Sequence, residues 1–169
     1  MELLIPGLIL VAVMAWASTR IKRNAAAAFD AETIDGAEFT IRKPDGWLSV
    51  AEPAGDRLFE AYSKEFGTNA EENIRRGTAS LDVSNGNADD VVRELAAGGN
   101  ELDDRREVID DIHYRVIELE QEGEAVFRRS LKLAEKNGKV YTLTVTTLAD
   151  ATDEFRQGVE TMIDSFVLK

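Results

Sequence analysis

Alternating apolar and polar residues recur along most of the chain after residue 32 and predict a domain rich in β-strands. A period of two sends one row of side chains into a core and the other to a wetter face. The extended runs lie at 39–42, 47–50, 58–62, 79–83, 113–120, 126–134 and 140–147. In the last run Tyr141, Leu143 and Val145 share one face, and threonines fill the other. Asn137-Gly138, just before this run, predicts a hairpin turn.

Two other segments repeat apolar residues every three or four positions, which predicts amphipathic helices. The stripes are Ala88, Val91, Val92, Leu95 and Ala96 in the first segment, and Phe155, Val159, Met162, Ile163 and Phe166 in the second. Asn87 and Thr152 stand where an N-cap belongs, and acidic residues follow in each first turn. Strands, a helix, more strands and a last helix predict an α+β domain with a mainly antiparallel sheet over residues 32–169.

The first 23 residues show a third pattern, an unbroken apolar run that ends in a basic collar. Residues 3–17 carry no charge, and three basic residues follow them. The run is somewhat shorter than the ~20 residues that span a bilayer comfortably, but flanking residues can extend it. We predict one transmembrane helix within residues 1–23, then an alanine-rich stalk at 24–31. The predicted membrane-anchor residues are Leu3, Leu4, Ile5, Leu8, Ile9, Leu10, Val11, Val13, Met14, Trp16, Arg20, Lys22 and Arg23.

A cleaved signal peptide is the alternative for the same segment. Ala15-Trp16-Ala17 fits a small-x-small cleavage pattern, whereas the two residues before the apolar run supply no positive charge. Because the basic residues follow the run, the positive-inside tendency favours a single-pass protein whose soluble domain lies on the cytoplasmic side. The opposite side remains open, since that rule is a tendency.

The part of the chain after the collar is strongly acidic. The whole chain has a formal net charge of −12, and residues 1–23 contribute +2, which leaves −14 for residues 24–169. Such a domain is repelled by nucleic-acid phosphates, so nucleic acid is not an expected partner. The absence of cysteine excludes disulfides, thiolate chemistry and cysteine-ligated zinc.

Three local features carry a family resemblance. Residues 39–47 (FTIRKPDGW) form a strand that runs into a Pro, Gly-Trp turn, residues 141–145 (YTLTV) form a late strand, and the closing helix ends in IDSF at 163–166. Together with the strand order over residues 32–169, they resemble the PsbP-like (Mog-type) family and its bacterial single-domain members. The resemblance implies an αβα sandwich around a central antiparallel sheet. It also implies binding rather than catalysis, as an accessory subunit of a membrane complex, a partner of a regulatory protein or an exported protein.

No group of residues in the sequence supports catalysis, a metal site or a cofactor. His113 is the only histidine, and no Gly-x-Ser-x-Gly motif accompanies it. An oxygen-rich turn invites calcium, and a charge-dense stretch invites a carboxylate pair. These residues are Asp82, Asn85, Asn87, Asp89 and Asp90 in the turn, and Asp103, Asp104, Asp110 and Asp111 in the stretch. A helix cap accounts for the turn and a solvated face accounts for the stretch, so we predict neither site.

The segment 66–77 (FGTNAEENIRRG) is the predicted partner-binding loop. It is long for a connection, and long loops often carry binding sites. Its contact residues are predicted to be Phe66, Ile74, Arg75 and Arg76, and Arg128 and Arg129 add a second basic edge. A short surface helix with ordinary charges is the alternative for this loop.

These features lead to two functional hypotheses. The first is a non-enzymatic, membrane-tethered accessory or scaffolding module that contacts the lipid bilayer through its anchor. It binds a membrane protein complex or another protein, and tethering raises the effective concentration. The alternative is a carrier of a small ligand or lipid, exported if the N-terminus is a signal peptide. Its apolar cleft is predicted between sheet and helix, along Tyr141, Leu143, Phe155 and Val159.

Overall fold

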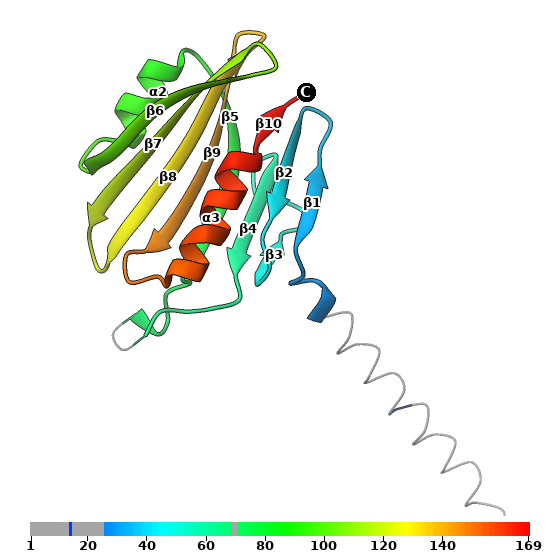
Figure 1. The fold of residues 1–169 in the computed structure, drawn as a ribbon, viewed down its shortest axis with the longest axis vertical. Helices are drawn as coiled ribbons and strands as arrows, with labels where there is room; N and C mark the ends of the chain where they lie inside the picture. Colours follow the sequence, from blue (N-terminus) through cyan, green and yellow to red (C-terminus); the bar gives the residue numbers. More distant parts are fainter. Residues whose placement is uncertain (1–13, 15–25, 69–70) are drawn as a thin grey trace, which may run out of the picture.

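The computed structural model describes residues 14, 26–68 and 71–169, which contain two antiparallel sheets and the helices α2 and α3 (Figure 1). The large sheet has the strand order β3-β4-β5-β9-β8-β7-β6. Its strands are β3 (Trp47–Ser49), β4 (Phe59–Ser63), β5 (Gly77–Asn85), β6 (Asn100–Ile109), β7 (Ile112–Glu122), β8 (Val126–Lys136) and β9 (Lys139–Leu148). The small sheet, in the order β1-β2-β10, consists of β1 (Glu32–Asp35), β2 (Phe39–Lys43) and β10 (Val167–Leu168). The helices are α2 (Ala88–Leu95) and α3 (Asp153–Ser165).

The two helices pack on opposite faces of the large sheet. Successive side chains of a strand point to opposite sides, and each helix packs against one of the two sets. We call the side that packs against α3 and the small sheet the inner face, and the side that packs against α2 the outer face. In Figure 1, α3 lies beside the small sheet, and α2 lies next to β6 and β7 at the other end of the large sheet. The predicted α+β class with a mainly antiparallel sheet is confirmed.

The inner face carries the main core. Trp47 stacks on Phe155 with ring centroids 5.5 Å apart, and both lie against the backbone of Gly77, where a Cβ would come within 2.6 Å of the indole. Tyr141 and Leu143, two of the residues assigned to a carrier cleft, are fully buried in the same cluster. These side chains therefore pack against neighbours and help to fill the core.

The predicted hairpin turn and the two predicted N-caps are present in the structure. Asn137 and Gly138 take positive φ values of 53° and 74° in the β8–β9 turn, which confirms the hairpin. Asn87 caps α2 by accepting a hydrogen bond from the Asp90 amide at 2.9 Å, and Thr152 caps α3. One element differs from expectation, since Asp103 and Asp104 of the charge-dense stretch lie in the edge strand β6, and Asp110 and Asp111 form the turn to β7. The many charged residues of β6 conceal the alternation that would have marked it as a strand.

A buried lysine joins the start of the described domain to its core. Lys43 is fully buried, and its ammonium group donates to the carbonyls of Ala28 (3.2 Å), Asp30 (2.6 Å) and Trp47 (2.7 Å). These three acceptors satisfy the ammonium group, and a buried charge requires such partners. The backbone just before β1 is thereby fixed to the domain.

The predicted membrane segment, apart from Met14, lies outside the described residues. Among residues 14, 26–68 and 71–169, no helix combines the length and apolar content needed to cross a bilayer.

Candidate functional site

The outer face is divided into two halves. Where α2 covers β7 and β8 the outer face is apolar, and Val92 of α2 packs against a cluster that contains Leu131 and Leu133. Over β5 and β9 the half-buried or exposed outward positions are mostly hydroxyl side chains, Thr78 and Ser80 on β5 and Thr144 and Thr146 on β9, whereas Asp82 on β5 is charged and Val140 and Thr142 on β9 are buried. We call this second region the hydroxyl half. It confirms that the threonine side of the last alternating run is the wetter one.

Strand register arranges the hydroxyl half into rows that cross the sheet. Thr78 pairs with Tyr62 on β4 and with Thr146 on β9, and Thr146 pairs in turn with Arg129 on β8. We call Tyr62, Thr78, Thr146 and Arg129 the first row. The second row, two residues further along each strand, consists of Glu60, Ser80, Thr144 and Leu131. Directly opposed side chains are close enough to act together on one ligand.

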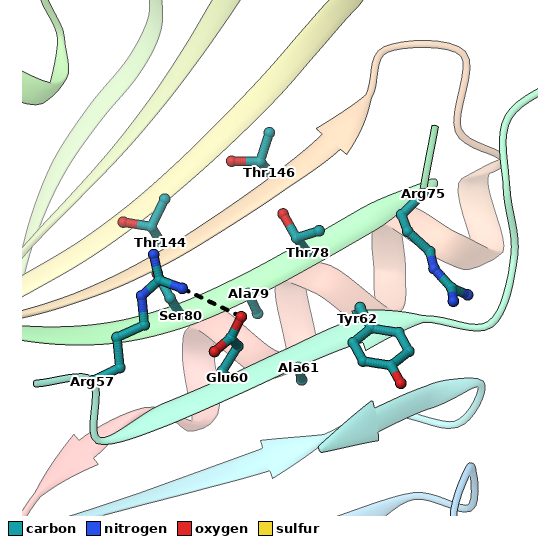
Figure 2. A pocket seen from close by; sticks show the side chains of 10 residues that line it. All are labelled: Arg57, Glu60, Ala61, Tyr62, Arg75, Thr78, Ala79, Ser80, Thr144 and Thr146. Carbon is teal, nitrogen blue, oxygen red and sulfur yellow. Dashed lines mark ion pairs between the residues drawn. The ribbon is translucent and has the colours of Figure 1, made fainter. Parts of the chain in front are cut away.

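A groove of about 310 Å³ lies over these rows on the outer face. Figure 2 shows Thr78, Thr144 and Thr146 on one side of the strands, with Ala61 and Ala79 pointing to the other. Charged and aromatic side chains of the β4 side border the groove, and these are Arg57, Glu60, Tyr62 and Arg75.

Arg75 is held in place by two aromatic rings. Its guanidinium carbon lies 4.6 Å from the ring centroid of Tyr62 and 4.1 Å from that of Phe66. One terminal nitrogen donates to the carbonyls of Ser63 (3.0 Å) and Lys64 (3.4 Å). A stacked guanidinium keeps its plane and its remaining donors oriented, which suits it to receive a carboxylate or phosphate.

Arg57, at the other end of the groove, is already neutralised. It lies 3.3 Å from Glu60 and 3.4 Å from Asp82, and Asp82 also accepts from the Ser80 hydroxyl at 2.7 Å. Because both ion pairs are solvent-exposed, each contributes at most about 1 kcal/mol to stability. In the described part of the chain Arg75 has no such carboxylate, so the net attraction for an anion is centred on Arg75.

The predicted binding loop folds back as an extension of β4 and β5. Phe66 and Arg75 form a bridge, the Gly67 amide donates to the Ile74 carbonyl at 2.9 Å, and Ile74 is half-buried. Phe66 remains 42% exposed beside Arg75. Arg76 is only 8% exposed and bonds within the loop, to the Phe66 carbonyl and the Glu65 carboxylate. The structure thus brings Phe66 and Arg75 together at the groove and gives Arg76 a role inside the loop.

The second basic pair separates across the sheet. Arg129 faces the outer side in the first row, whereas Arg128 faces the inner side and lies 4.0 Å from Glu120. Successive residues of one strand cannot share a face. Arg129 alone therefore belongs with Arg75.

Several of the residues weighed for chemistry have structural partners. In the oxygen-rich turn, Asn87 caps α2 and also donates to the Asp90 carboxylate, while Asp89 pairs with Arg115 at 3.1 Å. Asp104 receives two hydrogen bonds from the same Arg115, at 3.0 and 2.8 Å. His113 is exposed beside a separate hollow of about 520 Å³.

Titratable groups with shifted pKa values also have structural causes. Burial lowers the pKa of the Lys43 ammonium group and raises the pKa of the Tyr114 hydroxyl. The Tyr114 hydroxyl accepts a hydrogen bond from the Leu168 amide at 2.8 Å. Hydrogen bonds from Arg115 hold the pKa of the Asp104 carboxyl below its usual range. These shifts follow from packing and pairing, and none of the three groups lines the groove.

Several groove residues had no individual signal in the sequence. Thr78, Ser80 and Tyr62 come from strands that were predicted, but only register brings them beside Thr144 and Thr146. The alternation of the last run indicated a wet face and left open which strands would share it. The pairing of β5 with β9, which the sequence does not reveal, brings these residues onto one surface.

No protein-family model matches the chain, and no curated protein matches its sequence. Solved structures do match. The cyanobacterial PsbP (CyanoP) of Synechocystis has a TM-score of 0.56 at 16% identity and covers 83% of this chain and 94% of its own. LpqN of Mycobacterium tuberculosis, involved in cell envelope biogenesis, has a TM-score of 0.57 at 12% identity over 83% and 91%.

A third match is the Ran-binding protein Mog1p of Saccharomyces cerevisiae, with a TM-score of 0.51 at 9% identity over 83% of this chain and 96% of that one. The chain therefore has the fold shared by PsbP and Mog1 proteins, and the predicted resemblance is confirmed at the level of the fold. At such low identity the likeness transfers no site residues.

Proposed function

We propose that this protein is a non-enzymatic accessory module that binds another protein through the hydroxyl half of its outer face, and that its N-terminal segment tethers it to a membrane beside a membrane protein complex. The observation that carries the binding role is Arg75, stacked between Tyr62 and Phe66 at the border of the groove. An arginine that is flanked by aromatic rings and forms no ion pair among the described residues has the composition of a binding hot spot.

The fold comparison supports a binding role. One protein of this fold is described as Ran-binding, and another takes part in cell envelope biogenesis. Shifted pKa values in the described residues trace to burial and ion pairing and do not converge in the groove, as a catalytic pair would. Both observations favour recognition over catalysis.

Two observations support the tether. Residues 3–17 are uncharged and a basic collar follows, which is the pattern of a single-pass anchor with the domain on the cytoplasmic side. In the described domain, Lys43 fixes the backbone at Ala28 and Asp30, so the segment that leads to the anchor starts from a defined point. The few residues between the collar and Ala28 would keep the domain near the membrane surface and raise its effective concentration for a membrane-bound partner.

The test is a mild-detergent pull-down of the tagged full-length chain from its native membranes, with mass spectrometry of the bait and its companions. We expect intact bait, stoichiometric membrane-protein subunits, and loss of these subunits in Arg75→Glu. The matched control is Arg42→Glu, which makes the same charge change at an exposed position of β2 in the small sheet.

Each other outcome contradicts a stated part of the proposal. Subunits that remain bound to Arg75→Glu would remove the groove from the binding role. Bait that begins near Ser18 would show a cleaved signal peptide and remove the anchor. Bait recovered alone by both the unmodified chain and the control would contradict the accessory role itself.

A further inference from the structure

The hydroxyl half has an arginine at each end of its first row. Arg75 stacks over Tyr62 at the β4 end, and Arg129 stands at the β8 end, with Thr78 and Thr146 between them. The hollow beside Arg129 is also lined by Thr146, which lines the main groove too, so the two hollows meet at that residue. The first row is therefore one continuous binding surface across the four strands β4, β5, β9 and β8.

Both arginines keep unused binding capacity. Arg129 donates once to the Leu95 carbonyl, at 3.3 Å, and its Nε is buried with no hydrogen-bond partner in the part of the chain that the structure describes. The Nε atoms of Arg128 and Arg156, beside α3, are buried without a partner in the same way, so the capacity of Arg129 for a ligand lies in its terminal nitrogens. Across the described residues neither Arg75 nor Arg129 forms an ion pair.

The surroundings make these two charges distinctive. Residues 24–169 carry a net charge of −14, and Arg57, the other basic residue that lines the groove, is engaged with Glu60 and Asp82. Glu122 borders the hollow at Arg129 and is itself exposed. A ligand with an acceptor group for each arginine complements the first row, whereas a cationic ligand is repelled by the positive charges of Arg75 and Arg129.

The spacing of the row limits the shape of that ligand. Tyr62 and Arg129 lie three strand spacings apart, about 14 Å at ~4.8 Å per spacing. An extended peptide advances about 3.3–3.6 Å per residue, so four residues cover that distance. Side chains at i and i+4 of an extended segment also point to the same side. Hydroxyls between the arginines can donate to or accept from the segment's backbone.

We propose that the first row binds an extended acidic segment of a partner protein, with two carboxylates four residues apart, one on Arg75 and the other on Arg129. This inference rests on the proposed protein-binding function and specifies the chemistry of its partner. Guanidinium groups suit carboxylates because their paired N–H donors match the two carboxylate oxygens. The stacking of Arg75 reduces the ordering that binding requires.

The experiment selects binders from a displayed library of random dodecapeptides, with the full-length chain immobilised as bait in mild detergent. The affinities of the enriched peptides are then measured. We expect enrichment of Asp or Glu at positions i and i+4. Affinity should fall about tenfold, or about 1.4 kcal/mol, in Arg75→Glu and in Arg129→Glu. It should fall less in Arg75→Lys, which keeps the charge and loses the paired donors.

The control variant Arg42→Glu should bind the enriched peptides as the unmodified chain does, and thermal melting should show that every variant folds. Enrichment of peptides without the acidic pair, enrichment of acidic peptides with no preferred spacing, or no enrichment at all would overturn this proposal. Arg75-dependent binding to phosphatidylserine vesicles in place of peptides would assign the row to a lipid surface and overturn it as well. None of these results affects the membrane pull-down, so the proposed function stands or fails separately.

Discussion

The two halves of the outer face differ in chemistry although they belong to one continuous sheet. Under α2, the outward residues of β7 and β8 are Ile117, Leu119, Leu131 and Leu133, all at most 2% exposed. On the adjacent strand β9 and on β5 beyond it, the outward residues Thr144, Thr146, Thr78 and Ser80 carry hydroxyl groups, and none of them belongs to the cluster under α2. Leu131 and Thr144 are direct cross-strand neighbours, so the boundary between the halves is one strand wide.

This contrast indicates that the open half is not an apolar surface that lost its cover. Exposed apolar patches drive association through their area, without regard to direction. Hydroxyl groups gain little unless a partner meets them in the right geometry. The covered half therefore serves stability, and the open half is suited to specific, reversible recognition.

The largest expected effect comes from the covered side of the boundary. Leu131→Ala should lower the free energy of unfolding by about 2–5 kcal/mol, because it leaves a cavity beneath α2. Thr144→Ala, at the neighbouring position, should change it by no more than about 0.5 kcal/mol. Urea denaturation followed by circular dichroism measures both. Equal losses of unfolding free energy in the two variants would contradict the difference between the covered and the open half.

A smaller loss is expected when the cover itself is weakened. Asn87→Ala removes the side chain that accepts from the Asp90 amide, and loss of an N-cap costs about 1 kcal/mol. Hydrogen exchange should then accelerate in α2 before it does so in β9. A uniform acceleration of hydrogen exchange along the chain would show that α2 does not open independently of the sheet.

The next effect depends on pH and on the contact between α2 and the sheet. Arg115 joins Asp104 of β6 to Asp89 of α2 and lowers the pKa of the Asp104 carboxyl. The folded state therefore favours the charged carboxylate. Its stabilising contribution is complete above about pH 4, the usual pKa of an unfolded aspartate, and is lost as the pH falls through the lower folded pKa.

Asp104→Asn should accordingly be less stable than the unmodified chain at neutral pH, and the difference should shrink in acid below about pH 4. Denaturation curves at a series of pH values provide the measurement. Asp103→Asn serves as the control, since Asp103 points to the other face of β6. A difference that grows as the pH falls would contradict the assigned sign.

The smallest effect on stability is expected in the first row. The double variant Thr78→Val, Thr146→Val keeps the branched shape and removes both hydroxyls, so each change should alter stability by no more than about 0.5 kcal/mol. Partner recovery in the membrane pull-down should nevertheless decrease. Unchanged recovery would show that the hydroxyls are only a solvated surface, which would leave the arginines as the whole of the site.

The sequence specified the elements where a local rule was strong. Asn137-Gly138 identified a hairpin because few other residues take two successive positive φ values, and Asn87 and Thr152 identified helix starts. It did not reveal β6, whose charged residues suit an unpaired sheet edge and hide its period. Nor did it reveal the small sheet as a separate unit, because β10 is only two residues long and pairs with a strand 127 residues earlier, through Val167 and Thr40.

The candidate site was predictable in part for the same reason. Phe66 and Arg75 were selected from a loop, and the threonines from an alternating run, but their meeting depends on the pairing of distant strands. Arg76 looked equivalent to Arg75 in the sequence. The loop contacts bury Arg76 and leave Arg75 at the groove, a difference that only the three-dimensional arrangement contains.

The contacts of Lys43 have a mechanical consequence. Tension applied to the backbone before β1 reaches the domain through the carbonyls of Ala28 and Asp30. Lys43 passes that load to β2 and, through the Trp47 carbonyl, to the strand that anchors the core indole. The load therefore bypasses β1, the edge strand that would otherwise peel away first, and the domain should tolerate tension better than its short N-terminal strand suggests.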